Sequence, residues 1–209
     1  MDVNSLFLFV IACLTINMIP GPDVIYIVSN TMKGHTASAM KAALGLGVGY
    51  FFHTMAACLG LSAIIVSSAL AFSFIKWLGA FYLLYLGVRS LLSVWRGKQT
   101  IEVKSNSVSS HGVFMQGVIV SALNPKVAIF FLSFLPQFVD TSAGSVSMQL
   151  LLLGLLFSTL ATLCNVLYAV AGNWMFSRPS SQRYSRALEG VSGVLLIGLA
   201  GKLAYSESQ

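Results

Sequence analysis

Charged side chains are scarce in this sequence. Asp, Glu, Lys and Arg together make up 9% of the 209 residues, whereas hydrophobic residues make up 56%. The mean hydropathy is +0.83. A soluble domain carries roughly 25% charged residues, because its surface has to face water. The few charges here cannot cover such a surface, so the composition predicts an integral membrane protein.

Cysteine, histidine and acidic residues are also rare, and their scarcity argues against several kinds of site. The three cysteines and three histidines show no metal-type spacing such as Cys-x-x-Cys, so we expect no metal site and no cofactor. Neither a His-Glu-x-x-His motif nor a nucleophile elbow is present, so we do not expect an enzyme. The net charge of +6 first reports membrane orientation, and we expect no nucleic-acid partner.

Six apolar runs are long enough for transmembrane helices, since a span needs about 20 mostly apolar residues. They are predicted at about 5–30, 42–68, 72–94, 113–138, 148–176 and 187–205. The third and sixth have short charge-free centres, but Lys and Arg near helix ends can reach the headgroups. We therefore predict one all-α transmembrane domain over 1–209, interrupted only by a polar cytoplasmic loop at 96–111.

The positions of Lys and Arg predict the orientation, because cytoplasmic loops carry the excess of these residues. The first, third and fifth loops hold Lys33, Lys41, Arg96, Lys98, Lys104, Arg178, Arg183 and Arg186. Both termini are therefore expected to face outward. Three helices on each side of the long loop would then have opposite orientations, so about 1–95 and 112–209 are predicted to be inverted repeats, as in many transporters.

A helix break is predicted inside the first run at Ile19-Pro20-Gly21-Pro22-Asp23. Proline removes a backbone donor and clashes with the preceding turn, and glycine loosens the helix further. The freed carbonyl groups need protein, water or a ligand, since lipid cannot satisfy them. A structural kink without a ligand is the alternative. Asp23 favours a site, because a carboxylate in a span costs about 2.5–3.5 kcal/mol and normally faces an interior cavity.

The fourth run repeats this combination at Asn124-Pro125-Lys126. Lys126 is the only basic residue near the centre of any predicted run, and its depth favours a buried role over snorkelling to the surface. A pair between Asp23 and Lys126 would lower the cost of both charges. We state this pair as a hypothesis.

The second run begins with the glycine pattern Gly45-x-Gly47-x-Gly49. Gly45 and Gly49 have the small-xxx-small spacing that lets helices approach closely, so packing is the favoured interpretation. Exposure of the backbone to a substrate is the alternative, and on it both glycines are candidate binding residues. Such glycine surfaces could pack helices within one chain or join two copies, so a homodimer stays open.

These motifs together resemble the lysine exporter superfamily, and within it the homoserine/threonine exporter (RhtB) type. The matching elements are the two proline motifs, the glycine pattern, and residues 78–87 (LGAFYLLYLG). The resemblance covers essentially the whole chain in order and spacing. It implies a multi-pass protein of the bacterial inner membrane that exports amino acids or close derivatives, driven by the proton gradient. It also implies that the two proline motifs line the central site.

We therefore predict a secondary transporter that exports neutral amino acids such as homoserine or threonine, by proton antiport. An amino acid is a zwitterion: the half-helix starting near Pro22, or Lys126, would hold its carboxylate, and Asp23 or freed carbonyls its ammonium. Asp23 is also the predicted proton-coupling residue. The expected partners are the amino acid, protons and membrane lipids. The alternatives are export of another small solute or a cation, and a membrane-embedded enzyme. The predicted substrate-binding residues are Pro20, Gly21, Pro22, Asp23, Gly45, Gly49, Asn124, Pro125 and Lys126.

Overall fold

The computed structural model describes residues 3–19, 21–32, 36–96, 110–176 and 181–205. Within these residues the chain forms helices and turns and no β-strand, which confirms the predicted all-helical fold. The helices are α1 (Val3–Met18), α2 (Pro22–Met32), α3 (Thr36–Ala56), α4 (Ser62–Ser67), α5 (Ala69–Arg96), α6 (Ser110–Ala122), α7 (Pro125–Ile129), α8 (Val146–Phe176) and α9 (Ser181–Tyr205). A π-helical segment, Ala57–Leu61, joins α3 to α4, and π and 3-10 turns, Phe130–Phe134 and Leu135–Phe138, continue α7.

Three stretches of the described chain are long and apolar enough to cross a membrane unaided, at Thr36–Ile65, Ser73–Arg96 and Val146–Ala171. Their hydropathy agrees with a multi-pass membrane protein. The apolar part of α9, Gly190–Gly201, is shorter than a full span. With the two bent pairs described next, the described residues therefore supply three to five candidate spans, and the sixth span stays a prediction.

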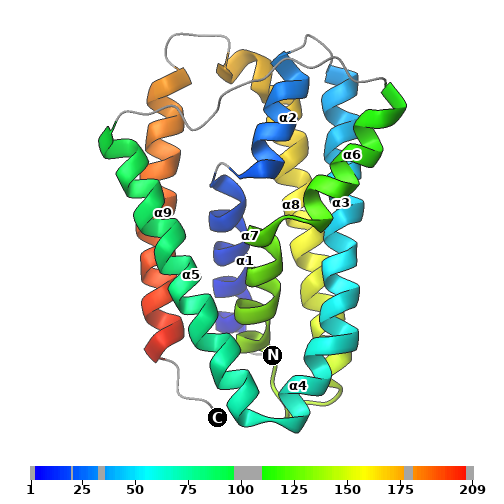
Figure 1. The fold of residues 1–209 in the computed structure, drawn as a ribbon, viewed down its shortest axis with the longest axis vertical. Coiled ribbons are helices and arrows are strands. Elements are labelled where there is room, and N and C mark those ends of the chain that lie inside the picture. The colour runs from blue at the N-terminus through cyan, green and yellow to red at the C-terminus, as the bar shows by residue number, and fades with distance from the viewer. Residues whose placement is uncertain (1–2, 20, 33–35, 97–109, 177–180, 206–209) are drawn as a thin grey trace.

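Two helix pairs reach the length of a span only together, because each pair is broken. Asn4–Met18 and Pro22–Thr31 meet at an angle of 56°, which confirms the break predicted in the first run. Gly112–Ala122 and Pro125–Phe138 meet at 41°, at the second proline motif. Both breaks lie at the middle height of the bundle, where α1 meets α2 and α6 meets α7 (Figure 1).

Several helices extend beyond the predicted apolar runs. The second run is predicted from 42, but α3 begins at Thr36, and the sixth is predicted from 187, but α9 begins at Ser181. The added residues include polar ones such as Ser38 and Lys41. Hydropathy detects the part of a helix that would contact lipid, whereas backbone hydrogen bonding continues into the polar turns beyond it.

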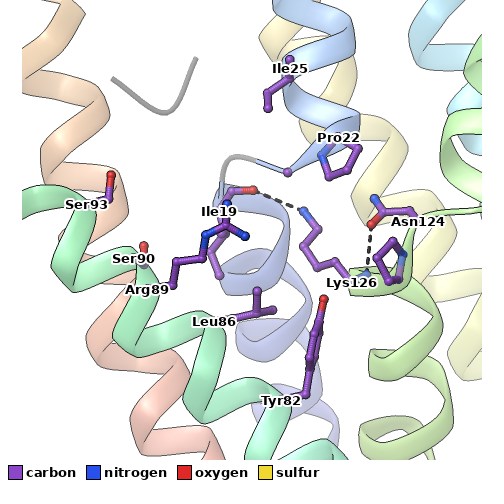
Figure 2. Close-up of a pocket in the computed structure, with 12 residues that line it drawn as sticks. Ile19, Pro22, Ile25, Tyr82, Leu86, Arg89, Ser90, Ser93, Asn124 and Lys126 are labelled. Carbon is purple, nitrogen blue, oxygen red and sulfur yellow. Dashed lines mark hydrogen bonds between the residues drawn. The ribbon is translucent and has the colours of Figure 1, made fainter. Parts of the chain in front are cut away.

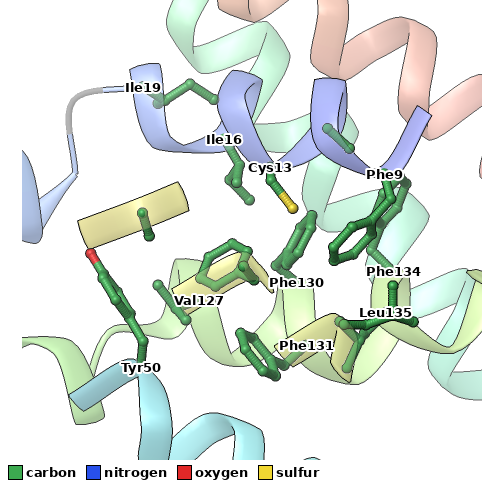
Figure 3. Packing of buried hydrophobic residues seen from close by; sticks show 14 of the residues in the cluster. Phe9, Cys13, Ile16, Ile19, Tyr50, Val127, Phe130, Phe131, Phe134 and Leu135 are labelled. Atoms are coloured by element: carbon green, nitrogen blue, oxygen red, sulfur yellow. The ribbon is translucent and has the colours of Figure 1, made fainter. Parts of the chain in front are cut away.

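The two breaks, with α1, α2 and α7, lie in the middle of the bundle (Figure 1). Extensive contacts join α5 to α9 on one side, and α3 to α6 and α8 on the other. Below the breaks, aromatic rings fill the space between α1, the turns after α7, and α8 (Figure 3). The Phe130 ring centre lies 5.0 Å from that of Phe157 and 5.1 Å from that of Phe134. This packed layer holds the two breaks against each other.

Glycines produce the close contact between α3 and α6. A Cβ atom at Gly45 would collide with the carbonyl oxygen of Phe114, and one at Gly49 would lie 2.8 Å from the carbonyl oxygen of Val118. Both glycines therefore sit where two backbones meet, in agreement with the favoured packing interpretation. Neither lines the cavity described below.

Gly45→Ala is expected to destabilise the protein by about 1–3 kcal/mol, because the new methyl group meets backbone that cannot move aside independently. The melting temperature of the purified protein in detergent measures this effect. Gly198→Ala is the matched control, since a Cβ atom there meets nothing within 4 Å. Equal melting temperatures for Gly45→Ala and wild type would contradict the packing role.

Candidate functional site

The first helix break removes donors from specific carbonyl groups. In an α-helix the carbonyl of residue i accepts from the N–H of residue i+4. Ile16 and Met18 lie four residues before Pro20 and Pro22, which have no N–H to give. The sequence therefore leaves two carbonyl groups at the end of α1 without their helical partners. Pro20 itself lies outside the described residues.

Side chains from distant helices satisfy these carbonyl groups. The Lys126 Nζ donates to the carbonyl oxygens of Ile16 and Ile19, each at 3.2 Å. The hydroxyl of Tyr168, from α8, donates to the carbonyl oxygen of Met18 at 3.5 Å. The negative end of α1 thus faces a cation, which is the favourable arrangement for a helix C-terminus.

Asp23 and Lys126 form a buried ion pair. The Lys126 Nζ lies 3.1 Å from both carboxylate oxygens of Asp23. The relative exposure of Asp23 is 0% and that of Lys126 is 4%. The structure thus contains the pair that the sequence suggests as a hypothesis. Asp23 stands in the first turn of α2, where the helix dipole also favours a negative charge.

The second break places Lys126 for this contact. Asn124 is the N-cap of α7, and its Oδ1 accepts from the backbone N–H of Lys126 at 3.0 Å. Pro125 occupies the first helical position, where the missing N–H costs nothing. The Asn-Pro-Lys sequence therefore starts a new helix and directs its lysine toward α1 and α2.

Two further residues complete the environment of Asp23. The Tyr50 hydroxyl, from α3, donates to the Asp23 Oδ2 at 3.3 Å, and the Asn165 Nδ2, from α8, donates to the Tyr50 hydroxyl oxygen at 2.9 Å. Tyr50 is fully buried. Neither residue is among the predicted substrate-binding residues. A phenol and an amide within apolar runs are the available signals, but they do not reveal which carboxylate they reach.

Gly21 leaves room for the ion pair. A Cβ atom at this position would lie 2.7 Å from the Asp23 Oδ1 and 2.9 Å from the Lys126 Nζ. Both distances are shorter than real Cβ contacts allow. The glycine between the two prolines is therefore required by the close approach of the pair as well as by the break.

A cavity of about 300 Å³ opens beside the ion pair (Figure 2). Its walls come from the first break, the start of α7 and one face of α5. The lining residues are Ile19, Gly21, Pro22, Ile25, Tyr82, Leu86, Arg89, Ser90, Ser93, Asn124, Pro125 and Lys126. Five of the predicted residues are thus brought together here, namely Gly21, Pro22, Asn124, Pro125 and Lys126, and Asp23 is bound to Lys126.

Asn124 has a donor that is not used. Its Oδ1 caps α7, which fixes the orientation of the amide, and its buried Nδ2 has no hydrogen-bond partner among the described residues. A buried amide hydrogen without an acceptor is unfavourable. Asn124 lines the cavity, so a solute there could supply the acceptor.

Comparison with known proteins decides the family. A family model described as a LysE type translocator matches residues 14–207. The chain belongs to the LysE-type translocator family. The resemblance inferred from the motifs is confirmed at this level, whereas the homoserine/threonine type stays a prediction. The LysE-type chain is accordingly a membrane transporter and not an enzyme.

Relatives extend over nearly the whole chain. An uncharacterized membrane protein of Bacillus subtilis is 30% identical over 215 residues, covering 98% of this chain and 100% of the relative. A leucine efflux protein of Salmonella choleraesuis is 25% identical over 208 residues, covering 99% and 97%. No solved structure matches the chain significantly.

Proposed function

We propose that this LysE-type translocator exports a neutral amino acid from the bacterial cytoplasm, across the inner membrane, in exchange for protons. The observation that carries the proposal is a buried Asp23–Lys126 pair beside a cavity, at the meeting point of two broken helices. Discontinuous helices with charged groups at mid-membrane are typical of binding sites in secondary transporters. The leucine efflux relatives add leucine to the homoserine and threonine predicted from the motifs.

The proposed ammonium site is occupied by the chain's own lysine. Asp23 and the carbonyl groups of Ile16 and Ile19, predicted to bind the substrate's ammonium, all accept from Lys126. An entering amino acid therefore competes with Lys126 for these acceptors. The displaced Lys126 ammonium is then free to hold the carboxylate, the role that the sequence suggested for it.

Proton coupling follows from the same carboxylate. Protonation of Asp23 from the outside removes its charge, so the substrate's ammonium loses its ionic partner and leaves outward. Loss of that proton to the cytoplasm restores the charge, and Lys126 returns to it. Each cycle of protonation and deprotonation of Asp23 thus carries one proton into the cytoplasm. Asp23 serves both binding and coupling.

The two halves of the chain support an inverted repeat. A broken helix followed by two further helical segments occurs as α1–α2, α3 and α5, and again as α6–α7, α8 and α9. With α9 as the sixth span, each half would have three spans of opposite orientation. Rocking of the halves around the ion pair would give alternating access. The homodimer that the sequence leaves open has no part in this proposal.

A cation exporter is the second candidate, and the site disfavours it. Cation sites gather several carboxylates or carbonyl oxygens. Within the described residues no group of three His, Cys, Asp or Glu could hold a metal ion, and Asp23 is already paired with Lys126. The zwitterion fits better, because the site offers groups of both signs.

An efflux panel tests the proposed function. Cells that overexpress the protein are loaded with dipeptides, and the release of each amino acid is followed with and without a protonophore. We expect one or a few neutral amino acids to leave faster than from cells without the protein, and the protonophore to stop the difference. Unchanged release of every amino acid by a correctly inserted protein would overturn the proposal.

A further inference from the structure

We propose that Arg89 joins Lys126 in binding the carboxylate of the exported amino acid, so that the cavity selects solutes with a free carboxylate. The inference rests on the proposed function and extends it to a helix outside both proline motifs. Arg89 is otherwise explained by orientation alone, as one of the basic residues near the cytoplasmic side.

The periodicity of α5 places Arg89 on the cavity face. Tyr82, Leu86, Arg89, Ser90 and Ser93 all line the cavity, with spacings of i, i+4, i+7, i+8 and i+11. This is one continuous face of an α-helix. Figure 2 shows these side chains on α5, with the Tyr82 ring extending toward Lys126.

The outer face of α5 is a different stripe. The exposed residues Phe74, Phe81, Val88 and Trp95 repeat every seven positions, as expected of a surface that contacts lipid. Arg89 is itself exposed and lies at the edge of this stripe, between the exposed Tyr85 and Leu92, seven residues before the helix end at Arg96, which corresponds to roughly 10 Å along the axis. Snorkelling to the membrane surface does not require a position on the cavity face.

Among the charged side chains that line the cavity, only Lys126 has an ion-pair partner within the described residues. Lys126 is neutralised by Asp23, whereas no carboxylate of the described residues lies within 4 Å of the Arg89 guanidinium. The described lining residues, together with Asp23, thus have an excess of one positive charge. A guanidinium presents its donors in a planar fork that matches a carboxylate.

The remaining lining fits the rest of an amino acid. Asp23 and the carbonyl groups at the end of α1 form the negative region, next to Lys126. The unpartnered Asn124 Nδ2 adds a second donor for an oxygen atom. Ile25 and Leu86 supply apolar wall for the side chain. The cavity volume of about 300 Å³ lies at the lower end of the range found for small-molecule binding sites.

The test uses purified full-length protein in vesicles of zwitterionic lipid, so that no anionic headgroup competes for Arg89. Radiolabelled leucine is the probe, and leucinamide, which lacks the carboxylate charge, is the competitor. We expect leucinamide to inhibit wild-type leucine transport poorly. We expect Arg89→Gln to raise the KM for leucine about 10- to 100-fold, as loss of a charged hydrogen bond does. Arg89→Lys retains the charge but not the planar fork of donors, so its KM should lie between those of wild type and Arg89→Gln.

Arg96→Gln is the matched control, because Arg96 is exposed on the same helix and does not line the cavity. Its KM should stay at the wild-type value. An unchanged KM in Arg89→Gln would overturn this inference and leave the proposed function intact. Equal inhibition by leucine and leucinamide in wild type would do the same. The second comparison tests recognition of the carboxylate without any variant, and Arg89→Lys, which retains the charge, assigns that recognition to Arg89 where Arg89→Gln fails to fold. If wild type transports no amino acid of the panel, the proposed function fails and the inference with it.

Discussion

Lys126→Met is expected to abolish export and to reduce the yield of folded protein. The substitution leaves the Asp23 carboxylate at 0% exposure with no ammonium beside it. Removing one partner of a buried pair typically costs about 3–5 kcal/mol, because the remaining charge has no compensation. Asp23→Asn should have a similar effect, since Lys126 would keep only the carbonyl groups at the end of α1. Size-exclusion profiles and melting temperatures in detergent measure folding, and leucine efflux measures export.

The double variant Asp23→Asn/Lys126→Met separates the two roles of the pair. It contains no unpaired charge, so its melting temperature should recover most of the loss seen in each single variant. Export should stay absent, because neither the proton-carrying group nor the competing lysine remains. Independent and additive losses of stability in the double variant would contradict the pairing as a source of stability.

Gly21→Ala is expected to lower export by tenfold or more while leaving the protein folded. The new Cβ would meet the Asp23 Oδ1 and the Lys126 Nζ, which are ends of side chains and can shift without moving backbone. The pair would therefore be displaced rather than destroyed, and misplacement of reacting groups by about 1 Å can cost on the order of 100-fold in rate. Initial efflux rates at equal protein amounts measure the effect.

Gly198→Ala again serves as the control for Gly21→Ala, since it adds the same methyl group where nothing lies within 4 Å. Its efflux rate should match wild type. A wild-type efflux rate in Gly21→Ala would show that the ion pair tolerates displacement. Transport would then not depend on the exact geometry of the pair. A loss of folding in Gly21→Ala alone would instead assign the glycine to stability.

The sequence predicts the two helix breaks and the residues around them, because their causes are local. Proline removes a hydrogen-bond donor wherever it stands, and a charge in an apolar run needs a partner whatever the fold. With one carboxylate and one ammonium near the centres of two runs, few pairings are available. The contact between Asp23 and Lys126 therefore follows as a hypothesis from the positions of these two residues in their runs.

The surroundings of the pair could not be predicted in the same way. Tyr50, Asn165 and Arg89 reach the site through the rotation and packing of α3, α8 and α5, which no local pattern in the sequence determines. Arg89 is the instructive case. Its positive charge is explained equally well by the excess of Lys and Arg on the cytoplasmic side of the membrane. Only the cavity distinguishes the face of α5 that lines it from the face that contacts lipid. The glycines of α3 show the converse, since their close approach is predictable but their partner helix is not.

The most direct test of the account measures protons and leucine together in vesicles of purified protein. Vesicles are loaded with leucine and a pH-sensitive dye, with equal pH on both sides and valinomycin and potassium to clamp the potential. We predict that leucine efflux acidifies the lumen in wild type, and that Asp23→Asn produces no acidification. Wild-type leucine efflux without acidification, or acidification that persists in Asp23→Asn, would contradict exchange through Asp23.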